Sequence, residues 1–194
     1  MMKRSLTIIA LVLTATPAMA RAQGGFGIKG GFSYGNVSNR GLLPGQLRER
    51  TGFALGAGLG TTGTPLSFGL EGLYAQRGVV SDNGPDARKL DYVDVPAYLR
   101  IAIPLPGLAP YAFAGPQLSF EVRCRAGDAA CPDTDRPKLT YAAIIGGGVR
   151  IGNAARFSIE GRYVYGLNDL KLSTVTSSES YKTRSFMILG GIGF

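Results

Sequence analysis

The chain has 194 residues and a formal net charge of +8, with 29 glycines, two cysteines and no histidine. The length is that of one domain, and the absence of histidine removes the side chain most often used as a catalytic base near neutral pH. The basic residues are spread along the chain, without a basic helix or an aromatic–basic motif, so nucleic acid is not an expected partner.

Residues 1–22 have the pattern of a cleaved signal peptide. Lys3 and Arg4 form a charged start, which is followed by a short apolar segment and then by small residues. The apolar segment is too short for a membrane anchor, and cleavage is expected after Ala20 or Ala22. We therefore expect the protein to be exported.

Residues 23–194 are expected to form one barrel domain built from eight segments in which apolar and polar residues alternate. Alternation is the sequence pattern of strands, and no segment in this range approaches the roughly 18 apolar residues of a membrane helix. Ten residues that rise about 3.3 Å each and tilt by about 45° cover about 24 Å, the height of the apolar band of an outer-membrane barrel. The expected strands are Gly25–Gly35, Thr51–Thr61, Leu66–Gly78, Leu90–Ile103, Pro110–Val122, Lys138–Ile151, Arg156–Gly166 and Tyr181–Phe194.

The connections between these strands alternate strictly between short and long. The short ones are residues 62–65, 104–109 and 152–155, and the longer, polar ones are residues 36–50, 79–89, 123–137 and 167–180. This alternation is typical of a barrel with short periplasmic turns, long outward loops and both termini in the periplasm. The expected fold class is all-β, an eight-stranded antiparallel transmembrane β-barrel with up-and-down topology.

Each expected strand has one apolar face and one face that carries its charges. On the fourth strand, alternate residues from Val93 to Ile103 are apolar, whereas Asp94, Tyr98 and Arg100 lie on the opposite face. Alternation alone does not say which face is inside, and a soluble barrel of the lipocalin type would place the apolar set inside. Aromatic residues near the strand ends and the low number of charges favour lipid outside. A soluble periplasmic ligand-binding barrel is the alternative.

Eight charged residues are expected on the inward face. Eight strands leave an interior just wide enough for side chains, and an unpaired ion in such an interior is costly. We therefore expect a network of salt bridges that fills the lumen, with a gate or a narrow channel for small solutes as the alternative. The eight residues are Lys29, Glu71, Asp94, Arg100, Glu121, Arg150, Glu160 and Arg162.

The motifs that could indicate an enzyme or a cofactor site do not support one. Two G-x-G-x-x-G matches begin at Gly25 and Gly58, but neither lies between a strand and a helix, as dinucleotide binding requires. Cys124 and Cys131 enclose six residues and are expected to form a local disulfide in an oxidising compartment, because two cysteines without histidine do not make a metal site. We expect no enzyme activity, metal or other cofactor.

The end of the sequence is an apolar, glycine-rich strand that stops at an aromatic residue. In a soluble protein such an exposed edge promotes aggregation, so this strand is expected to pair with the first strand and close the barrel. Ile188, Gly190, Ile192 and Phe194 share one face and resemble the C-terminal signal that barrel-assembly machinery reads during biogenesis.

Three segments carry a family pattern. Residues 71–78 read E-x-x-Y-x-x-x-G, residues 92–100 read Y-x-x-x-P-x-x-x-R, and residues 110–116 read P-Y-x-x-x-G-P. In this order the motifs resemble the third, fourth and fifth strands of outer-membrane β-barrel domain proteins, often called porin family or PorT-like. The resemblance implies an eight-stranded barrel of the Gram-negative cell outer membrane, similar to OmpX or to the membrane domain of OmpA.

A barrel of this kind is expected to have a structural or surface-interaction role through its extracellular loops. Its neighbours would be outer-membrane lipid and lipopolysaccharide, with the barrel-assembly machinery as a partner during biogenesis. The sequence indicates no specific protein or ligand partner.

Overall fold

The computed structural model describes most of the chain after residue 23. The described ranges are residues 24–37, 47–61, 65–81, 88–126, 129–130, 138–152, 156–167, 170–174, 177–181 and 183–193. The expected signal peptide (residues 1–22), Cys131 and Phe194 lie outside these ranges.

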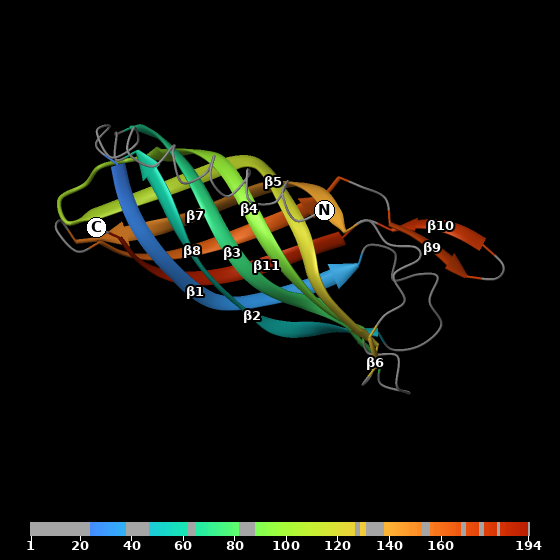
Figure 1. Ribbon diagram of the computed structural model, residues 1–194. Coiled ribbons are helices and arrows are strands. Elements are labelled where there is room, and N and C mark those ends of the chain that lie inside the picture. Colours follow the sequence, from blue (N-terminus) through green and yellow to red (C-terminus); the bar gives the residue numbers. More distant parts are fainter. Residues whose placement is uncertain are drawn as a thin grey trace, which may run out of the picture.

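Eight long antiparallel strands form a closed barrel (Figure 1). The strands are β1 (Gly24–Val37), β2 (Leu47–Thr61), β3 (Leu66–Ser81), β4 (Arg88–Ala102), β5 (Leu108–Ala126), β7 (Leu139–Ile151), β8 (Arg156–Gly166) and β11 (Thr183–Gly193). The first strand pairs with the last, as in the pair Lys29 and Gly191, and β4 pairs with β5, so every barrel strand has two neighbours. The expected fold class is thereby confirmed, and in the described residues no helix is long and apolar enough to cross a membrane.

The barrel strands differ from the expected ones mainly at the end that carries the long connections, the loop end. Pairing between β4 and β5 continues to Arg88 and Ala126, which lengthens both strands. The expected last strand begins too early, because Tyr181 pairs with Leu170 in a separate hairpin of β9 (Leu170–Thr174) and β10 (Ser177–Tyr181). This hairpin lies beyond the loop end in Figure 1, and the two-residue β6 (Ala129–Ala130) pairs with the end of β5.

The opposite end of the barrel, the turn end, has tight connections whose sequence explains their shape. Between β4 and β5, Leu105 and Leu108 exchange two backbone hydrogen bonds of 2.9 and 3.2 Å around Pro106 and Gly107. Gly107 has a φ of 73°, a conformation that a side chain disfavours but that the third residue of a Pro-Gly turn requires. This turn fixes the register of the β4–β5 pair.

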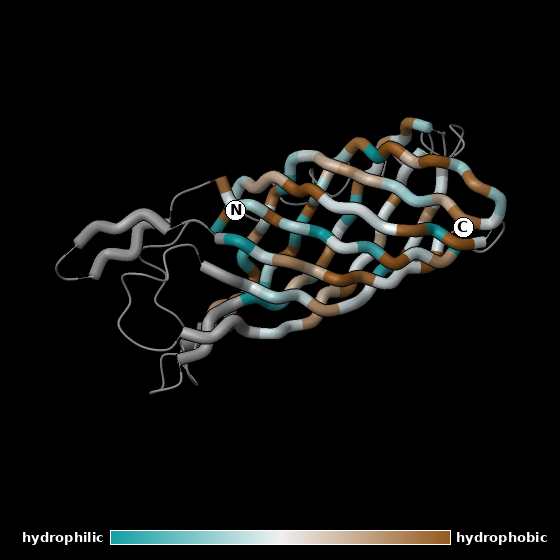
Figure 2. The backbone as a smooth tube through the Cα atoms, turned by 180° about the vertical axis from the view of Figure 1, so that it is seen from behind, coloured by the Kyte–Doolittle hydropathy of each residue, from teal (hydrophilic) through white to brown (hydrophobic). Residues whose placement is uncertain are grey.

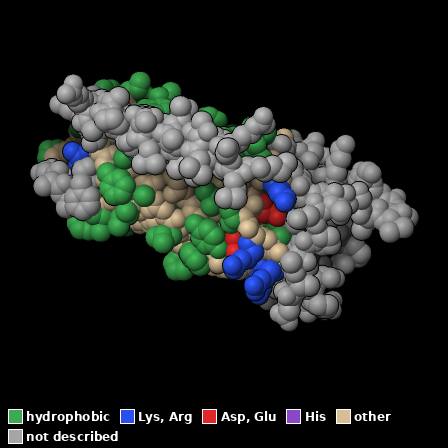
Figure 3. Space-filling model, in the orientation of Figure 1, with side chains coloured by type: hydrophobic (Ala, Val, Ile, Leu, Met, Phe, Trp, Pro, Cys, Tyr) green, Lys and Arg blue, Asp and Glu red, His purple; other side chains and the backbone are tan. Residues whose placement is uncertain are grey.

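The apolar face of each strand points outward. Phe32, Ile145 and Ile159 are 59%, 62% and 65% exposed, whereas Arg162 and Leu189 on the inward face are fully buried. Figure 2 shows hydrophobic residues interspersed along the strands of the barrel wall, and Figure 3 shows hydrophobic side chains over part of the visible outer surface. This orientation is the reverse of that in a soluble ligand-binding barrel.

One irregularity departs from simple alternation. The pairing of β4 with β5 shifts by one residue between Asp91 and Tyr92, because β5 has an extra residue, Val122, between Glu121 and Arg123. The neighbouring Val122 and Arg123 of β5 are both exposed. A bulge of this kind places two consecutive side chains on the same side of the strand, which strict alternation does not predict.

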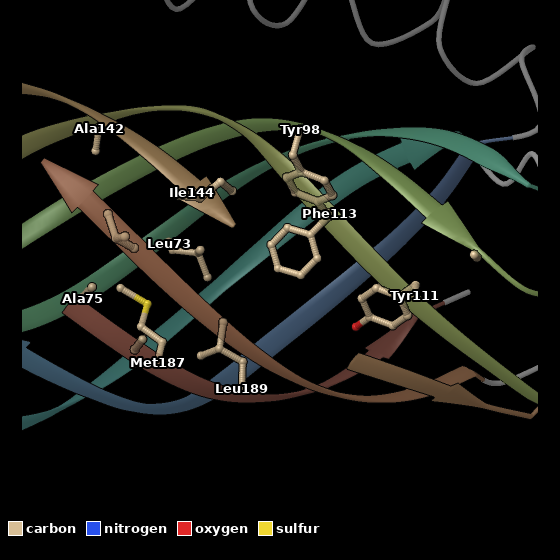
Figure 4. Close-up of a cluster of buried hydrophobic side chains, with 12 residues drawn as sticks. Leu73, Ala75, Tyr98, Tyr111, Phe113, Ala142, Ile144, Met187 and Leu189 are labelled. Atoms are coloured by element: carbon tan, nitrogen blue, oxygen red, sulfur yellow. The ribbon is translucent and has the colours of Figure 1, made fainter. Parts of the chain in front are cut away.

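Apolar side chains fill the part of the lumen nearer the loop end. Leu73, Met187 and Leu189 are 1%, 0% and 0% exposed and extend into the barrel from β3 and β11 (Figure 4). Tyr98, Phe113 and Tyr111 continue this interior toward the turn end. Their rings pack in tilted pairs, with centroids 5.1 Å apart for Tyr98 and Phe113 and 6.1 Å apart for Phe113 and Tyr111.

Glycines on the inward face let side chains and strands approach closely, and this generates a first prediction. A Cβ atom at Gly115 would lie 2.0 Å from the Ala97 carbonyl oxygen and 2.6 Å from the Tyr98 Cα atom. Gly115→Ala is therefore expected to lower the free energy of unfolding by about 1–3 kcal/mol, the usual cost of overpacking. Urea titration of protein folded in detergent measures this free energy.

Gly72→Ala is the matched control. A Cβ atom at Gly72 would have no atom within 4 Å, so this variant is expected to unfold at the wild-type urea concentration or slightly above it. Equal loss of stability in the two variants would contradict the close-approach explanation.

Candidate functional site

The centre of the lumen holds a closed ring of four ion pairs. Lys29 Nζ lies 2.7 Å from Glu71 Oε1 and 2.8 Å from Glu160 Oε2. Arg162 Nη2 lies 2.6 Å from Glu71 Oε2 and 2.7 Å from Glu160 Oε1. Each cation thus contacts both carboxylates, and the ring joins β1, β3 and β8 across the barrel.

Two tyrosine hydroxyl groups extend the ring to the opposite wall. Tyr98 on β4 donates a hydrogen bond to Glu71, and Tyr111 on β5 donates one of 2.8 Å to Glu160 Oε2. The Arg162 guanidinium also lies over the Phe113 ring, with its Cζ 5.2 Å from the ring centroid. Such an aromatic face attracts a cation and so contributes to its stabilisation where water is excluded.

A second ion pair lies nearer the loop end. Arg77 on β3 pairs with Asp94 on β4, whose side chain is fully buried. Arg77 was not among the residues expected in the lumen, although it lies six positions after Glu71 and therefore on the same face of its strand. The even spacing from Glu71 was the signal that could have identified it.

The ion pairs of the described residues place four of the eight expected charges in the ring and a fifth, Asp94, in a different pair, and a single network of all eight stays a prediction. The ring contains Lys29, Glu71, Glu160 and Arg162. Asp94 belongs to the separate pair with Arg77. The ring and this pair lie at different heights, because Glu71 and Arg77 are six residues apart on β3 and are therefore well separated along the barrel axis.

The other three expected charges lie on either side of the ring. Glu121 is half-buried near the loop end, opposite Tyr92 on the neighbouring strand. Arg100 and Arg150 lie toward the turn end. Arg100 donates a hydrogen bond of 2.9 Å to the Tyr98 hydroxyl and lies over the Tyr111 ring, with its Cζ 4.8 Å from the centroid.

The lumen is closed at the level of the ring and above it. Arg162, Met187 and Leu189 have no exposed surface, and Glu160 and Leu73 are 1% exposed. The ring, the apolar layer and the Arg77–Asp94 pair follow one another toward the loop end. A solute would have to displace all three layers to cross the barrel.

The remaining expected sites are only partly within the described residues. Cys124 is disulfide-bonded, whereas Cys131, the other cysteine of the chain, lies outside the described ranges, so their pairing stays a prediction. Ile188, Gly190 and Ile192 share the outward face of β11, and Phe194 is not described. In the described part of the chain, no group of three or more carboxylate, cysteine or histidine residues could hold a metal ion.

Comparison with protein families shows which family the chain belongs to. The sequence matches the profile of the outer membrane protein beta-barrel domain over residues 6–188. The chain belongs to this family. It is accordingly a protein of the Gram-negative outer membrane, and the exposed apolar wall of this outer-membrane barrel is the surface that faces lipid.

Solved structures show the same fold at low sequence identity. The crystal structure of Neisserial surface protein A is 13% identical, with a TM-score of 0.58, and the match covers 87% of this chain and 95% of that one. The outer membrane protein OprG from Pseudomonas aeruginosa is 13% identical, with a TM-score of 0.51 and coverage of 89% and 97%. The outer membrane enzyme PagL is 11% identical, with a TM-score of 0.48 and coverage of 85% and 97%. No curated protein sequence matches the chain.

The ring generates a second prediction. Glu160→Ala would leave Lys29 and Arg162 with one carboxylate partner between them in the barrel interior. We expect the free energy of unfolding to fall by about 2–5 kcal/mol, the usual range when one member of a buried ion pair is removed. Urea unfolding of the detergent-folded barrel, followed by heat-modifiable gel migration, measures the change.

Arg123→Ala serves as the control, because Arg123 is exposed on β5 near the loop end. This variant is expected to change stability by less than about 0.5 kcal/mol, as surface substitutions usually do. A Glu160→Ala variant as stable as the Arg123→Ala variant would show that the ring does not stabilise the barrel.

Proposed function

We propose that this protein is a membrane-embedded scaffold that acts through its extracellular loops and does not conduct solutes. The observation that carries the proposal is the closed lumen, in which Arg162, Met187 and Leu189 are fully buried. A channel requires a continuous polar path, and the apolar layer between the ring and the Arg77–Asp94 pair offers none.

The structure at the loop end also supports a role of the extracellular loops in recognition. The four long, polar connections of the sequence all leave the barrel at this end. There β9 and β10 form a hairpin, and in the described residues these two strands pair only with each other. Loops carried on a rigid barrel are a common site of recognition. A surface role also agrees with the name of Neisserial surface protein A, which has a similar fold.

We propose further that the protein is not an enzyme and that its immediate surroundings are outer-membrane lipid and lipopolysaccharide. The chain contains no histidine, so it lacks the usual near-neutral base of acyl-transfer and hydrolytic sites. The two carboxylates of the ring contact cations and tyrosine hydroxyl groups. In these contacts they do not act as a base toward a nucleophilic side chain.

Conductance in planar lipid bilayers tests the closed lumen. The wild-type protein is expected to give no steady open state, whereas Glu160→Ala is expected to give brief, small openings because the layers above a broken ring are displaced more easily. Steady, large conductance of the wild type would contradict the proposal and would favour the alternative of a narrow channel for small solutes.

Ile145→Lys separates loss of stability from loss of closure. Ile145 lies in the middle of β7 on the lipid face and is 62% exposed. A lysine there is expected to cost about 2–4 kcal/mol because hydrocarbon does not solvate the charge. It should leave conductance at the wild-type level, so openings in this variant would show that instability alone opens the barrel.

The proposed recognition by the barrel-assembly machinery gives a further prediction. Deletion of Phe194 is expected to reduce the amount of folded protein in the outer membrane, while the same variant refolded in detergent keeps nearly the wild-type free energy of unfolding. Phe194→Tyr retains an aromatic end and should insert normally. Normal outer-membrane levels of the deletion variant would disprove this function of the C-terminal strand.

A further inference from the structure

A cavity of about 100 Å³ opens inside the barrel at the turn end, below the ring of ion pairs. A single water molecule needs roughly 10–15 Å³ on the same scale, so this space holds several waters or one small ligand. Its walls come from strands on both sides of the barrel, including β1, β4, β5, β7 and β8, and its floor is formed by Lys29, Glu71 and Tyr98 of the central ring and its extension.

The charges that line this cavity are strongly unbalanced. Arg100, Arg150, Arg156 and Lys29 line it, but Glu71 is its only carboxylate among the described residues. Glu71 is already engaged by Lys29, by Arg162 and by the Tyr98 hydroxyl. The ring therefore does not neutralise Arg100 and Arg150 at the turn end.

Two of these arginines have no carboxylate partner within the described part of the chain. Arg100 contacts the Tyr98 hydroxyl and two aromatic rings, and its buried Nε atom has no hydrogen-bond partner. Arg150 lies close enough to Arg100 and Arg156 for their positive charges to repel its own. Like charges gathered in a partly enclosed space destabilise one another, so this arrangement favours an anion from outside.

We propose that the turn-end cavity binds a phosphate-bearing anion that enters from the periplasmic side. The planar guanidinium group donates two parallel hydrogen bonds to phosphate oxygens, and arginines on different strands can contact different oxygens of one phosphate. A phosphate group carries more than one negative charge. It therefore matches a site with several arginines better than a ligand with a single carboxylate group would. Because the ring closes the cavity from above, this is a binding site and not the entrance of a channel.

The same phosphate chemistry has two possible sources. One is a free phosphate or phosphate ester in the periplasm, and the other is the head group of an anionic phospholipid in the leaflet that surrounds the turn end. Arg156 begins β8 and pairs with Gly193 near the end of β11, at the rim where a head group could reach the cavity.

Calorimetric titration of inorganic phosphate into the full mature protein, folded in a non-ionic maltoside detergent at low ionic strength, tests the site. Saturable binding with one phosphate per protein is expected. Arg150→Gln should weaken binding about tenfold or more, because it removes a charged, fork-shaped donor. Arg150 has no ion pair with any described residue, so this substitution is expected to leave the unfolding transition unchanged, which the same preparation can verify.

Two matched variants separate a built site from general attraction. Arg150→Lys keeps the charge but loses the paired donors, and it should bind phosphate with intermediate affinity. Arg123→Gln removes the same formal charge at the loop end, where Arg123 is exposed, and should bind like the wild type. Absence of saturable binding by the wild type, or equal weakening by Arg123→Gln and Arg150→Gln, would overturn the proposal.

Native mass spectrometry from mixed micelles identifies the source of the phosphate. If the head group is the ligand, phosphatidylglycerol should be retained by the wild type, lost with Arg150→Gln and displaced by inorganic phosphate, whereas phosphatidylcholine should not be retained. If phosphate binds in the calorimeter and phosphatidylglycerol is not retained, the ligand is a soluble phosphate. Retention of both lipids equally by the wild type and by Arg150→Gln, together with no phosphate binding, would refute the site.

Discussion

The closed ring of Lys29, Glu71, Arg162 and Glu160 is the constraint around which the rest of the barrel is arranged. Its members are as much as 131 positions apart in the sequence, and each cation contacts both carboxylates. Four buried charges are tolerated only when they are paired and receive further hydrogen bonds. Tyr98 and Tyr111 supply such bonds from the opposite wall, so the ring fixes five strands relative to one another.

The glycines and the aromatic residues of the interior follow from this arrangement. A lumen that holds a ring of large charged side chains and three packed aromatic rings has little space left for its walls. Gly69 illustrates the consequence, because a Cβ atom there would lie 2.4 Å from the Tyr98 ring. Gly146 has the same relation to the Phe113 ring. The inward face therefore combines a few large residues with glycine, whereas the outward face is predominantly apolar and meets lipid.

The ring also divides the lumen into two parts with different chemistry. Toward the loop end, buried apolar side chains and the Arg77–Asp94 pair occupy the space. Toward the turn end, the same ring is the floor of a cavity of about 100 Å³ lined by Arg100, Arg150 and Arg156. This division gives the loop end of the barrel a packed interior and the turn end an open cavity.

The sequence by itself determined the strands, their number, the alternation of short and long connections and the charged side of each strand. These features are local, because an alternating period of two residues and a Pro-Gly turn depend only on neighbouring residues. The sequence did not determine which face is inside, since both choices satisfy the same alternation. Family membership and the burial of Arg162 and Glu160 decided that question.

Only the tertiary structure decided which charges meet. Lys29 and Glu160 are brought together by the closure of β1 onto β11 and by the stagger of the strands, which no local pattern records. The same stagger placed Arg100 and Arg150 below the ring instead of within it and paired Asp94 with Arg77. Alternation also did not predict the bulge at Val122 of β5, because it depends on how β4 pairs with β5. Contacts across a barrel are set by register and tilt, and these are properties of the whole closed sheet.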